Sequence, residues 1–204
     1  MSKMQINTTK KLYKGKYQYN IVLVCAFSHV FRGNNVDAYF NRITREQKLL
    51  KTTNTWRSPS DLAYTTKIYH ELSNMDDYCT RVEFPAVTIY TNTYSDIIAL
   101  RDIDITKARS ISMPPANLEA GTIYMPTMDY EFRVTIGRTE QKYLDFLEWA
   151  DAINKLRITN SCRDMLSQHA SYGGGHFYVT GDNMLLMCRM QLAGIKLTVD
   201  RIVH

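Results

Sequence analysis

The order of hydrophobic patterns in residues 130–203 constrains the fold of this chain more than any other feature. Apolar and polar residues alternate in "YEFRVTIG", "KLRITN", "GHFYVTG" and "IKLTVDRIV", a period of two that is typical of strands. Between them, "RTEQKYLDFLEWADAIN" and "DNMLLMCRMQLAG" have the apolar spacing of helices. The segment therefore predicts the order β-α-β-β-α-β, in which two split βαβ units share one sheet backed by helices.

The first half of the chain predicts the same order under one assumption. A buried strand is expected at 17–27, a helix at 36–50, an added helix at 58–74 and a strand at 81–92. A helix at 93–103 and a strand at 104–113 follow. The order is completed if "LLKTTNTW" (49–56) is also a strand. We therefore expect an α/β (α+β) chain of tandem ferredoxin-like split βαβ sandwiches, with mixed sheets backed by helices. One continuous mixed sheet is the alternative.

The expected organisation has four parts, and the adjacent prolines of "MPPANLEAG" (113–121) are the best candidate for a domain boundary. The parts are a basic N-terminal arm (1–16), an N-terminal α/β module (17–113), a linker or hairpin (114–129) and a C-terminal ferredoxin-like βαββαβ module (130–204). Because residues 1–11 have no hydrophobic period, we expect the arm to be mobile.

Positive charge is concentrated in the first quarter of the chain. Residues 1–57 hold eleven Lys and Arg against two Asp and Glu, a net charge of +9, and the remainder has a net charge of −4. Such asymmetry favours an anionic partner, either nucleic acid or an acidic protein. The alternative is a solvated arm that keeps the protein soluble or docks on the acidic remainder.

Two segments of this quarter supply candidate contacts to nucleic acid, because cations neutralise phosphates and aromatic rings stack on bases. The candidate cations are Lys10, Lys11, Lys14, Lys16, Arg32, Arg42, Arg45 and Lys48, and the candidate rings are Tyr17, Tyr19 and Trp56. In "SHVFRGNN" (28–35), His29, Arg32 and the backbone near Gly33 are placed to hold a phosphate. The alternatives are a helix-capping turn for 28–35 and an edge strand protected by lysines for 10–19.

The stretch "SYGGGHFYVTGDN" (171–183) adds a candidate stacking surface. It resembles in part the RNP1 strand of the RNA recognition motif family: Gly175, Tyr178 and Val179 fit, and His176 replaces a stacking ring. The pattern's basic first residue and last aromatic are missing. Strand alternation directs Phe177 and Val179 toward the helices and leaves His176 and Tyr178 on the open face. The alternative is that both pack against the other domain.

The same stretch does not predict a phosphate loop, because its glycines precede a strand and the Lys-Ser/Thr ending is missing. We expect Gly173–Gly175 to give freedom to a mobile entry loop. Four scattered cysteines predict reduced thiols in an intracellular, cytoplasmic protein. We predict no catalytic residue, no metal site and no cofactor, and we expect no membrane partner because the chain has no 18-residue apolar run.

Three functions remain at this point. The leading one is a non-enzymatic nucleic-acid-binding protein, with RNA and DNA both open. The second is an assembly subunit of a multi-protein complex, for example a viral one, in which the arm clasps a neighbour and supports a homo-oligomer; the 14 tyrosines and 10 methionines suit interfaces. The third is a nucleotide-processing enzyme centred on His29, Arg32 and residues 173–182.

Overall fold

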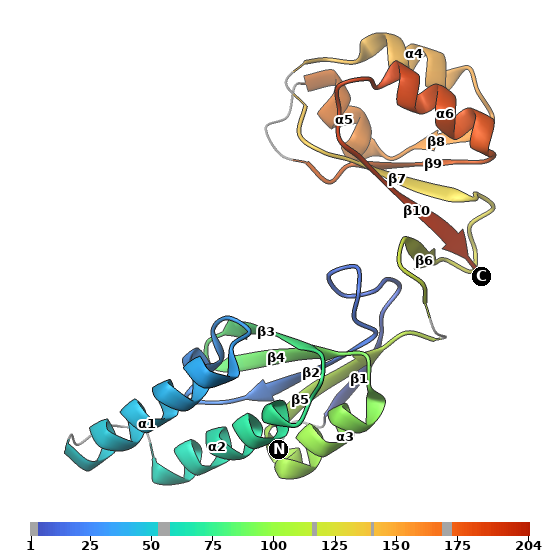
Figure 1. Ribbon diagram of the computed structural model, residues 1–204. Helices are drawn as coiled ribbons and strands as arrows, with labels where there is room; N and C mark the ends of the chain where they lie inside the picture. The colour runs from blue at the N-terminus through green and yellow to red at the C-terminus, as the bar shows by residue number, and fades with distance from the viewer. Residues whose placement is uncertain (1–3, 53–57, 116–117, 140, 169–172) are drawn as a thin grey trace. The chain divides into compact units, whose positions relative to one another are not determined.

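The computed structural model describes residues 4–52, 58–115, 118–139, 141–168 and 173–204 (Figure 1). The chain forms two compact units, Met1–Asn117 and Leu118–His204. The division falls inside residues 113–121, where the adjacent prolines lie. Each unit contains a five-stranded mixed sheet of its own, so the alternative of one continuous sheet is wrong.

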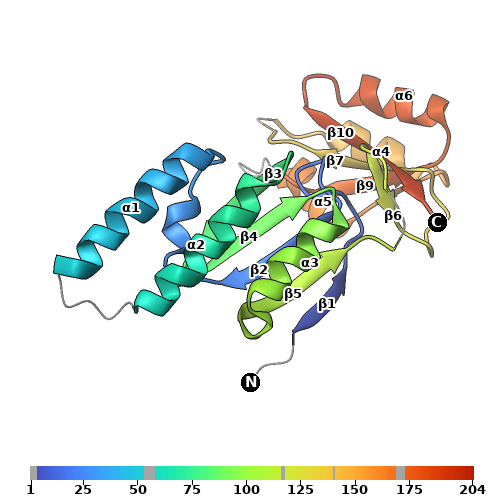
Figure 2. The same ribbon diagram turned by 60° about the horizontal axis from the view of Figure 1, so that its bottom comes forward.

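Unit 1 places its helices on one face of the sheet, as Figure 2 shows. The strand order is β1-β5-β2-β4-β3; β1 is parallel to β5, and the other neighbours are antiparallel. Its elements are β1 (Gln5–Thr8), β2 (Tyr19–Val24), the 3-10 turn η1 (Ser28–Phe31), α1 (Val36–Thr52), α2 (Pro59–Ser73), β3 (Tyr78–Glu83), β4 (Ala86–Thr91), α3 (Tyr94–Ile103), η2 (Ile105–Lys107) and β5 (Ala108–Met113).

Unit 2 repeats this arrangement with different connections. The strand order is β6-β10-β7-β9-β8, and β6 is the one strand parallel to its neighbour among those described. Its elements are β6 (Thr122–Tyr124), β7 (Phe132–Ile136), α4 (Leu144–Asp151), β8 (Leu156–Ile158), α5 (Asn160–Gln168), β9 (His176–Val179), α6 (Asp182–Gln191) and β10 (Leu197–Val203).

Both units have the split βαβ topology with one extra edge strand. Strands β2, β3, β4 and β5 of unit 1 correspond to β7, β8, β9 and β10 of unit 2, and in each sheet the last of these lies beside the first. The edge strands β1 and β6 then pair in parallel with β5 and β10. The expected tandem ferredoxin-like α/β fold is confirmed. Each unit also has an extra edge strand of its own.

The strand assignment within unit 1 needs one correction. Residues 49–52 belong to α1, so the expected strand at 49–56 is wrong there, and residues 53–56 lie outside the described part of the chain. The second strand of the split βαβ order is β3 instead. It pairs with β4 through a tight hairpin at Phe84-Pro85, so the segment at 81–92 holds parts of two strands. Prolines interrupt strand ladders, and here the proline marks the turn.

The N-terminal segment also differs from the expected mobile arm. Residues 5–8 form β1, which pairs with β5 from Gln5–Ser110 to Thr8–Met113. Residues 9–18, which we call the 9–18 loop, then connect β1 to β2, and Leu12 and Tyr17 in this loop are buried. Backbone pairing and apolar contacts therefore hold this segment in unit 1, and the short polar strand has too few apolar residues to be visible in the sequence.

Strand alternation decides which face of each sheet is apolar. In unit 1, Ile21 and Ile89 face the helices, and they join a core with α1, α2 and α3. In unit 2, Val134, Phe177 and Val179 face α4, α5 and α6. Tyr178 lies in a separate cluster on the opposite face, as the alternation of side chains along β9 predicts. In this way the residues on the open faces are fixed by the ladders that also bury the core.

The glycines of 173–175 are packed closely, which corrects the expected mobile loop. A Cβ on Gly175 would lie 2.7 Å from Met165 Sδ and 2.8 Å from Cys162 Cα, and one on Gly173 would lie 3.0 Å from the Gly137 carbonyl carbon. Gly174 has a φ of +113°, which side chains rarely adopt. Backbone bonds between this segment and Ile136 extend the ladder between β7 and β9. The glycines allow backbone to approach α5 and the end of β7.

We predict that Gly175→Ala lowers the free energy of unfolding of unit 2 by about 1–3 kcal/mol, because the added methyl group forces α5 to shift. Urea denaturation in a Trp56→Phe background measures this, since Trp149 then reports on unit 2 alone. The exposed Gln191→Ala change is the control and should stay within about 0.5 kcal/mol of the parent. Equal midpoints for the two variants would contradict the close contact with α5.

Candidate phosphate-binding site

One face of α1 and the turn before it form a basic cavity. Arg42, Arg45, Glu46 and Leu49 follow the spacing i, i+3, i+4, i+7, which places them on one side of the helix. Together with His29 and Arg32 they line a cavity of about 290 Å³. The structure therefore brings together three of the predicted cations, Arg32, Arg42 and Arg45, beside the predicted His29.

Hydrogen bonds inside the cavity hold η1 against α1. Arg42 Nη1 donates to the carbonyl oxygens of Val30 at 2.8 Å and Arg32 at 2.6 Å. His29 Nε2 lies 2.9 Å from Glu46 Oε1, so the single carboxylate of the cavity sits against an imidazole. With His29 neutral, three guanidinium groups and one carboxylate give the cavity a formal charge of +2.

A second set of hydrogen bonds fixes the loop between η1 and α1. Asn34 Oδ1 accepts from the Thr80 backbone N–H at 2.9 Å, and Asn34 Nδ2 donates to Cys79 Sγ at 3.2 Å. Thr80 Oγ1 donates to the Phe31 carbonyl oxygen at 2.7 Å, and the buried Tyr39 hydroxyl donates to Gly33. These bonds hold the loop against β3, so they also fix the backbone at Arg32.

Burial acts on the hydroxyl group that anchors this loop. It raises the pKa of Tyr39 above its ordinary value, and the hydrogen bond with Thr80 opposes that shift. The Tyr39 hydroxyl therefore stays protonated at neutral pH and continues to donate to the loop.

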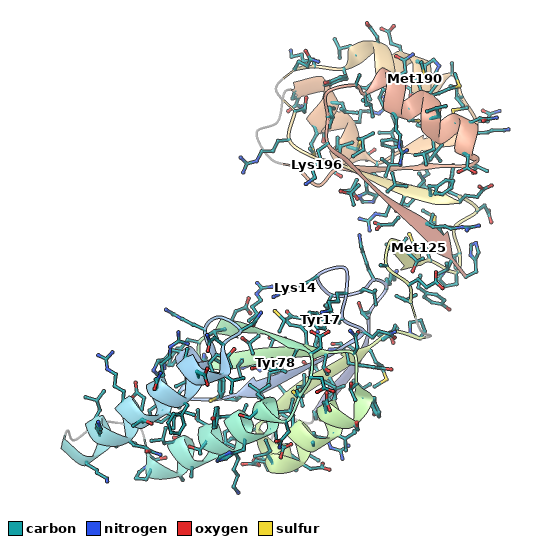
Figure 3. The ribbon with its side chains drawn as sticks, in the orientation of Figure 1. Lys14, Tyr17, Tyr78, Met125, Met190 and Lys196 are labelled. Carbon is teal, nitrogen blue, oxygen red and sulfur yellow. The ribbon has the colours of Figure 1, made fainter. Side chains whose placement is uncertain are left out.

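Two lysines of the 9–18 loop, Lys14 and Lys16, contact their own unit. Figure 3 shows Lys14 and Tyr17 on the side of the sheet away from α1, α2 and α3. Lys14 has a φ of +53°, and its ammonium group contacts Cys79 Sγ and lies 5.3 Å from the centre of the Tyr90 ring. Lys16 Nζ lies 2.9 Å from Asp77 Oδ1 and 5.2 Å from the centre of the Tyr17 ring. Their charges are engaged within the unit.

The predicted stacking rings of unit 1 are buried to different degrees. Tyr17 is 7% exposed and packs with Tyr13, Tyr90 and Cys79 over the open face of the sheet. Tyr19 is half-buried, with its ring centre 5.5 Å from that of Tyr94.

The remaining sites predicted in the first quarter lie apart from the cavity lining. Lys10 and Lys48 are exposed, and Lys11 is half-buried. Trp56 lies outside the described residues.

The open face of unit 2 is covered by its own chain. Tyr178 is 6% exposed and lies in a cluster to which Met125, Met128 and Tyr130 contribute. These residues belong to the segment between β6 and β7, where Figure 3 labels Met125. His176 is half-buried, and burial, followed by the charge of Arg133, lowers its pKa. Residues Met125, Met128 and Tyr130 of the same unit thus pack on Tyr178.

Sequence reasoning missed several residues beside these predicted sites. Glu46 lines the cavity, and its spacing from Arg42 and Leu49 was the available signal. On unit 2, the register places Arg133, Tyr178 and Arg157 in one row across β7, β9 and β8. Both arginines stand at polar positions of alternating strands, a signal that becomes specific only when the strand order is known.

Thiol and metal chemistry have little support in the described residues. All four cysteines are buried and unpaired, and burial raises the pKa of Cys162 and of Cys188 to about 12. Within the described ranges, no group of three or more His, Cys, Asp or Glu is placed to hold a metal ion. His169 lies outside those ranges.

We predict that Asp77→Asn loosens the 9–18 loop, because Asp77 accepts hydrogen bonds from both Lys16 and the Tyr17 hydroxyl. Hydrogen exchange of the Tyr13 and Tyr17 amides, which bond each other's carbonyls, should become faster. The neighbouring exposed residue gives the control Asp76→Asn, which should leave exchange unchanged.

The same contact has a pH dependence. The hydrogen bond from Lys16 holds the pKa of Asp77 below its usual value. The contact therefore stabilises the loop above a pH of about 4 and is lost as the pH falls through the lowered pKa. Unchanged exchange in Asp77→Asn would show that the loop is held by its apolar contacts alone.

Comparison with known proteins does not assign the chain to a family. No family model matches the chain, and no curated protein or solved structure matches it. In the part of the chain that the structure describes, no helix is both long enough and apolar enough to cross a membrane. The function is therefore argued from the geometry of the cavity.

Proposed function

We propose that this chain is a non-enzymatic nucleic-acid-binding protein, and that the cavity formed by His29, Arg32, Arg42 and Arg45 contacts phosphate. The observation that carries the proposal is that three arginines, Arg32, Arg42 and Arg45, line one cavity. Arginine presents a planar set of donors that matches phosphate oxygens in pairs, so clustered arginines are typical of phosphate recognition.

The distribution of charge between the units supports this location. Unit 1 holds sixteen Lys and Arg against ten Asp and Glu, a net charge of +6, and unit 2 holds nine against ten, a net charge of −1. Attraction of a polyanion and release of its counterions both scale with local positive charge. We therefore expect nucleic acid to bind unit 1.

The cavity is a stronger candidate than the 9–18 loop. The Lys16 ammonium group is paired with Asp77, and the Lys14 ammonium group contacts Cys79 and the Tyr90 ring. A phosphate would have to displace these contacts before binding either lysine. In the cavity, by contrast, Arg42 is already oriented by two backbone carbonyls, and Arg32 and Arg45 are exposed. Such preorganisation lowers the entropy lost on binding.

One contact favours a second candidate, a nucleotide-processing enzyme. The His29–Glu46 pair has the geometry of a base oriented by a carboxylate, and it lies beside the arginines. Loss of a detected turnover on Glu46→Gln, with binding retained, would favour this candidate. The assembly subunit stays a prediction from composition.

We predict that Arg45→Ala weakens binding of a short single strand phosphorylated at both ends by about tenfold or more, since a hydrogen bond to a charged group is lost. Fluorescence anisotropy over a salt series should also show a slope in log K against log salt that is smaller by about 1. Arg32→Ala should behave alike. Arg42 is unsuitable for this test because it anchors η1.

The matched control is Arg109→Ala. Arg109 is exposed on β5, which is separated by β2 from β4 and β3, so the variant removes the same charge from the same unit away from η1. It should keep the parent slope. If the parent protein fails to bind the phosphorylated strand at any salt concentration, the proposed function is wrong.

A further inference from the structure

We propose that the cavity recognises the terminal phosphate of a nucleic-acid strand, a phosphomonoester, in preference to the phosphodiesters inside the strand. This inference rests on the proposed function and names the ligand of the same site. It follows from the charge, the donors and the size of the cavity.

Charge is the first argument. A terminal phosphomonoester carries a charge of about −1.5 to −2 at neutral pH, whereas an internal phosphodiester carries a single negative charge. The formal charge of the cavity is +2 when His29 is neutral. The monoester dianion therefore balances the cavity, and a diester leaves one positive charge without compensation in a partly enclosed space. This formal charge already includes the Glu46 carboxylate, which lies 2.9 Å from His29 Nε2.

The number of donor groups is the second argument. A terminal phosphate offers three oxygens that are not shared with a second sugar. Three arginines line the cavity, and the guanidinium group of each has several N–H donors in a fixed plane. Arg42 Nη1 donates to two backbone carbonyl oxygens, and these two bonds fix the orientation of the guanidinium group. A diester, with two such oxygens, leaves one of the three arginines without an equivalent partner.

The volume of the cavity and the apolar side chain of Leu49 also fit the end of a strand. A cavity of about 290 Å³ lies at the lower end of small-molecule pockets, which are about 300–1,000 Å³. It accommodates the phosphate and part of one nucleotide, whereas a strand running through would need an extended groove. Leu49 is 39% exposed at the cavity and provides an apolar surface for the sugar or base next to the phosphate.

The test compares strands of one sequence that differ only at their ends: a 5′-phosphate, a 3′-phosphate, or hydroxyl groups at both ends. Anisotropy should show about tenfold tighter binding for one of the phosphorylated strands than for the hydroxyl-ended strand. Arg45→Ala and Arg32→Ala should abolish this preference, Arg45→Lys should restore part of it, and Arg109→Ala should leave it intact. Circular dichroism checks that each variant is folded.

The outcomes separate this inference from the proposed function. Equal binding of all three strands overturns the terminal-phosphate assignment and leaves nucleic-acid binding standing. Failure to bind any strand overturns both. Competition with a nucleoside monophosphate and with inorganic phosphate distinguishes the source of the monoester. If either displaces the phosphorylated strand as well as the unlabelled strand does, the ligand is the free phosphate compound and the strand-end assignment is wrong.

Discussion

The antiparallel ladder of β2 with β4 and β5 is the constraint on which unit 1 depends. Its register sets Ile21 opposite both Ile89 and Ile111, so one face of the sheet is apolar and must be covered by helices. Covering that face places α1 beside η1, which directly follows β2. The packing that covers the core thus also brings Arg32, Arg42 and Arg45 to one cavity.

The loop that carries Arg32 is also held by hydrogen bonds to β3. Asn34 bridges to the backbone of β3 and to Cys79, while Tyr39 and Thr80 tie the backbone at Gly33. A polar network of this kind is stable only when its members are satisfied together, and it gives the loop one conformation. Hydrogen bonds thus hold the proposed phosphate site from two sides, through Arg42 of α1 and through the contact of Asn34 with Thr80 of β3.

The repeat of topology extends to a detail of the open faces. Tyr90 of β4 and Tyr178 of β9 occupy corresponding third strands, and each is covered by the segment that joins the edge strand to the first strand of the split βαβ order. In unit 1 this cover is the 9–18 loop, with Tyr13 over Tyr90, and in unit 2 it is residues 125–131, with Tyr130 over Tyr178. Tyr178, which a partial RNP1 pattern makes a candidate for stacking, is therefore an interior residue of its own unit.

Alternating apolar residues were enough to predict strands β7, β8, β9 and β10 of unit 2, the facing of Phe177 and Val179, and the tandem fold, because these depend on local periodicity. Strand β6 lies in the segment expected to be a linker or hairpin. The helix at 36–50 and the charge of the first quarter were also legible in the sequence. Strand β1 and the hairpin at Phe84-Pro85 were not, since a short polar strand and a turn inside an apolar run have no period of their own. Only the tertiary structure decided which cations converge. Lys14 and Lys16 fold onto Cys79 and Asp77, sixty-five and sixty-one residues away, while Arg32, Arg42 and Arg45 share a cavity, and contacts over such separations are set by packing of the whole unit.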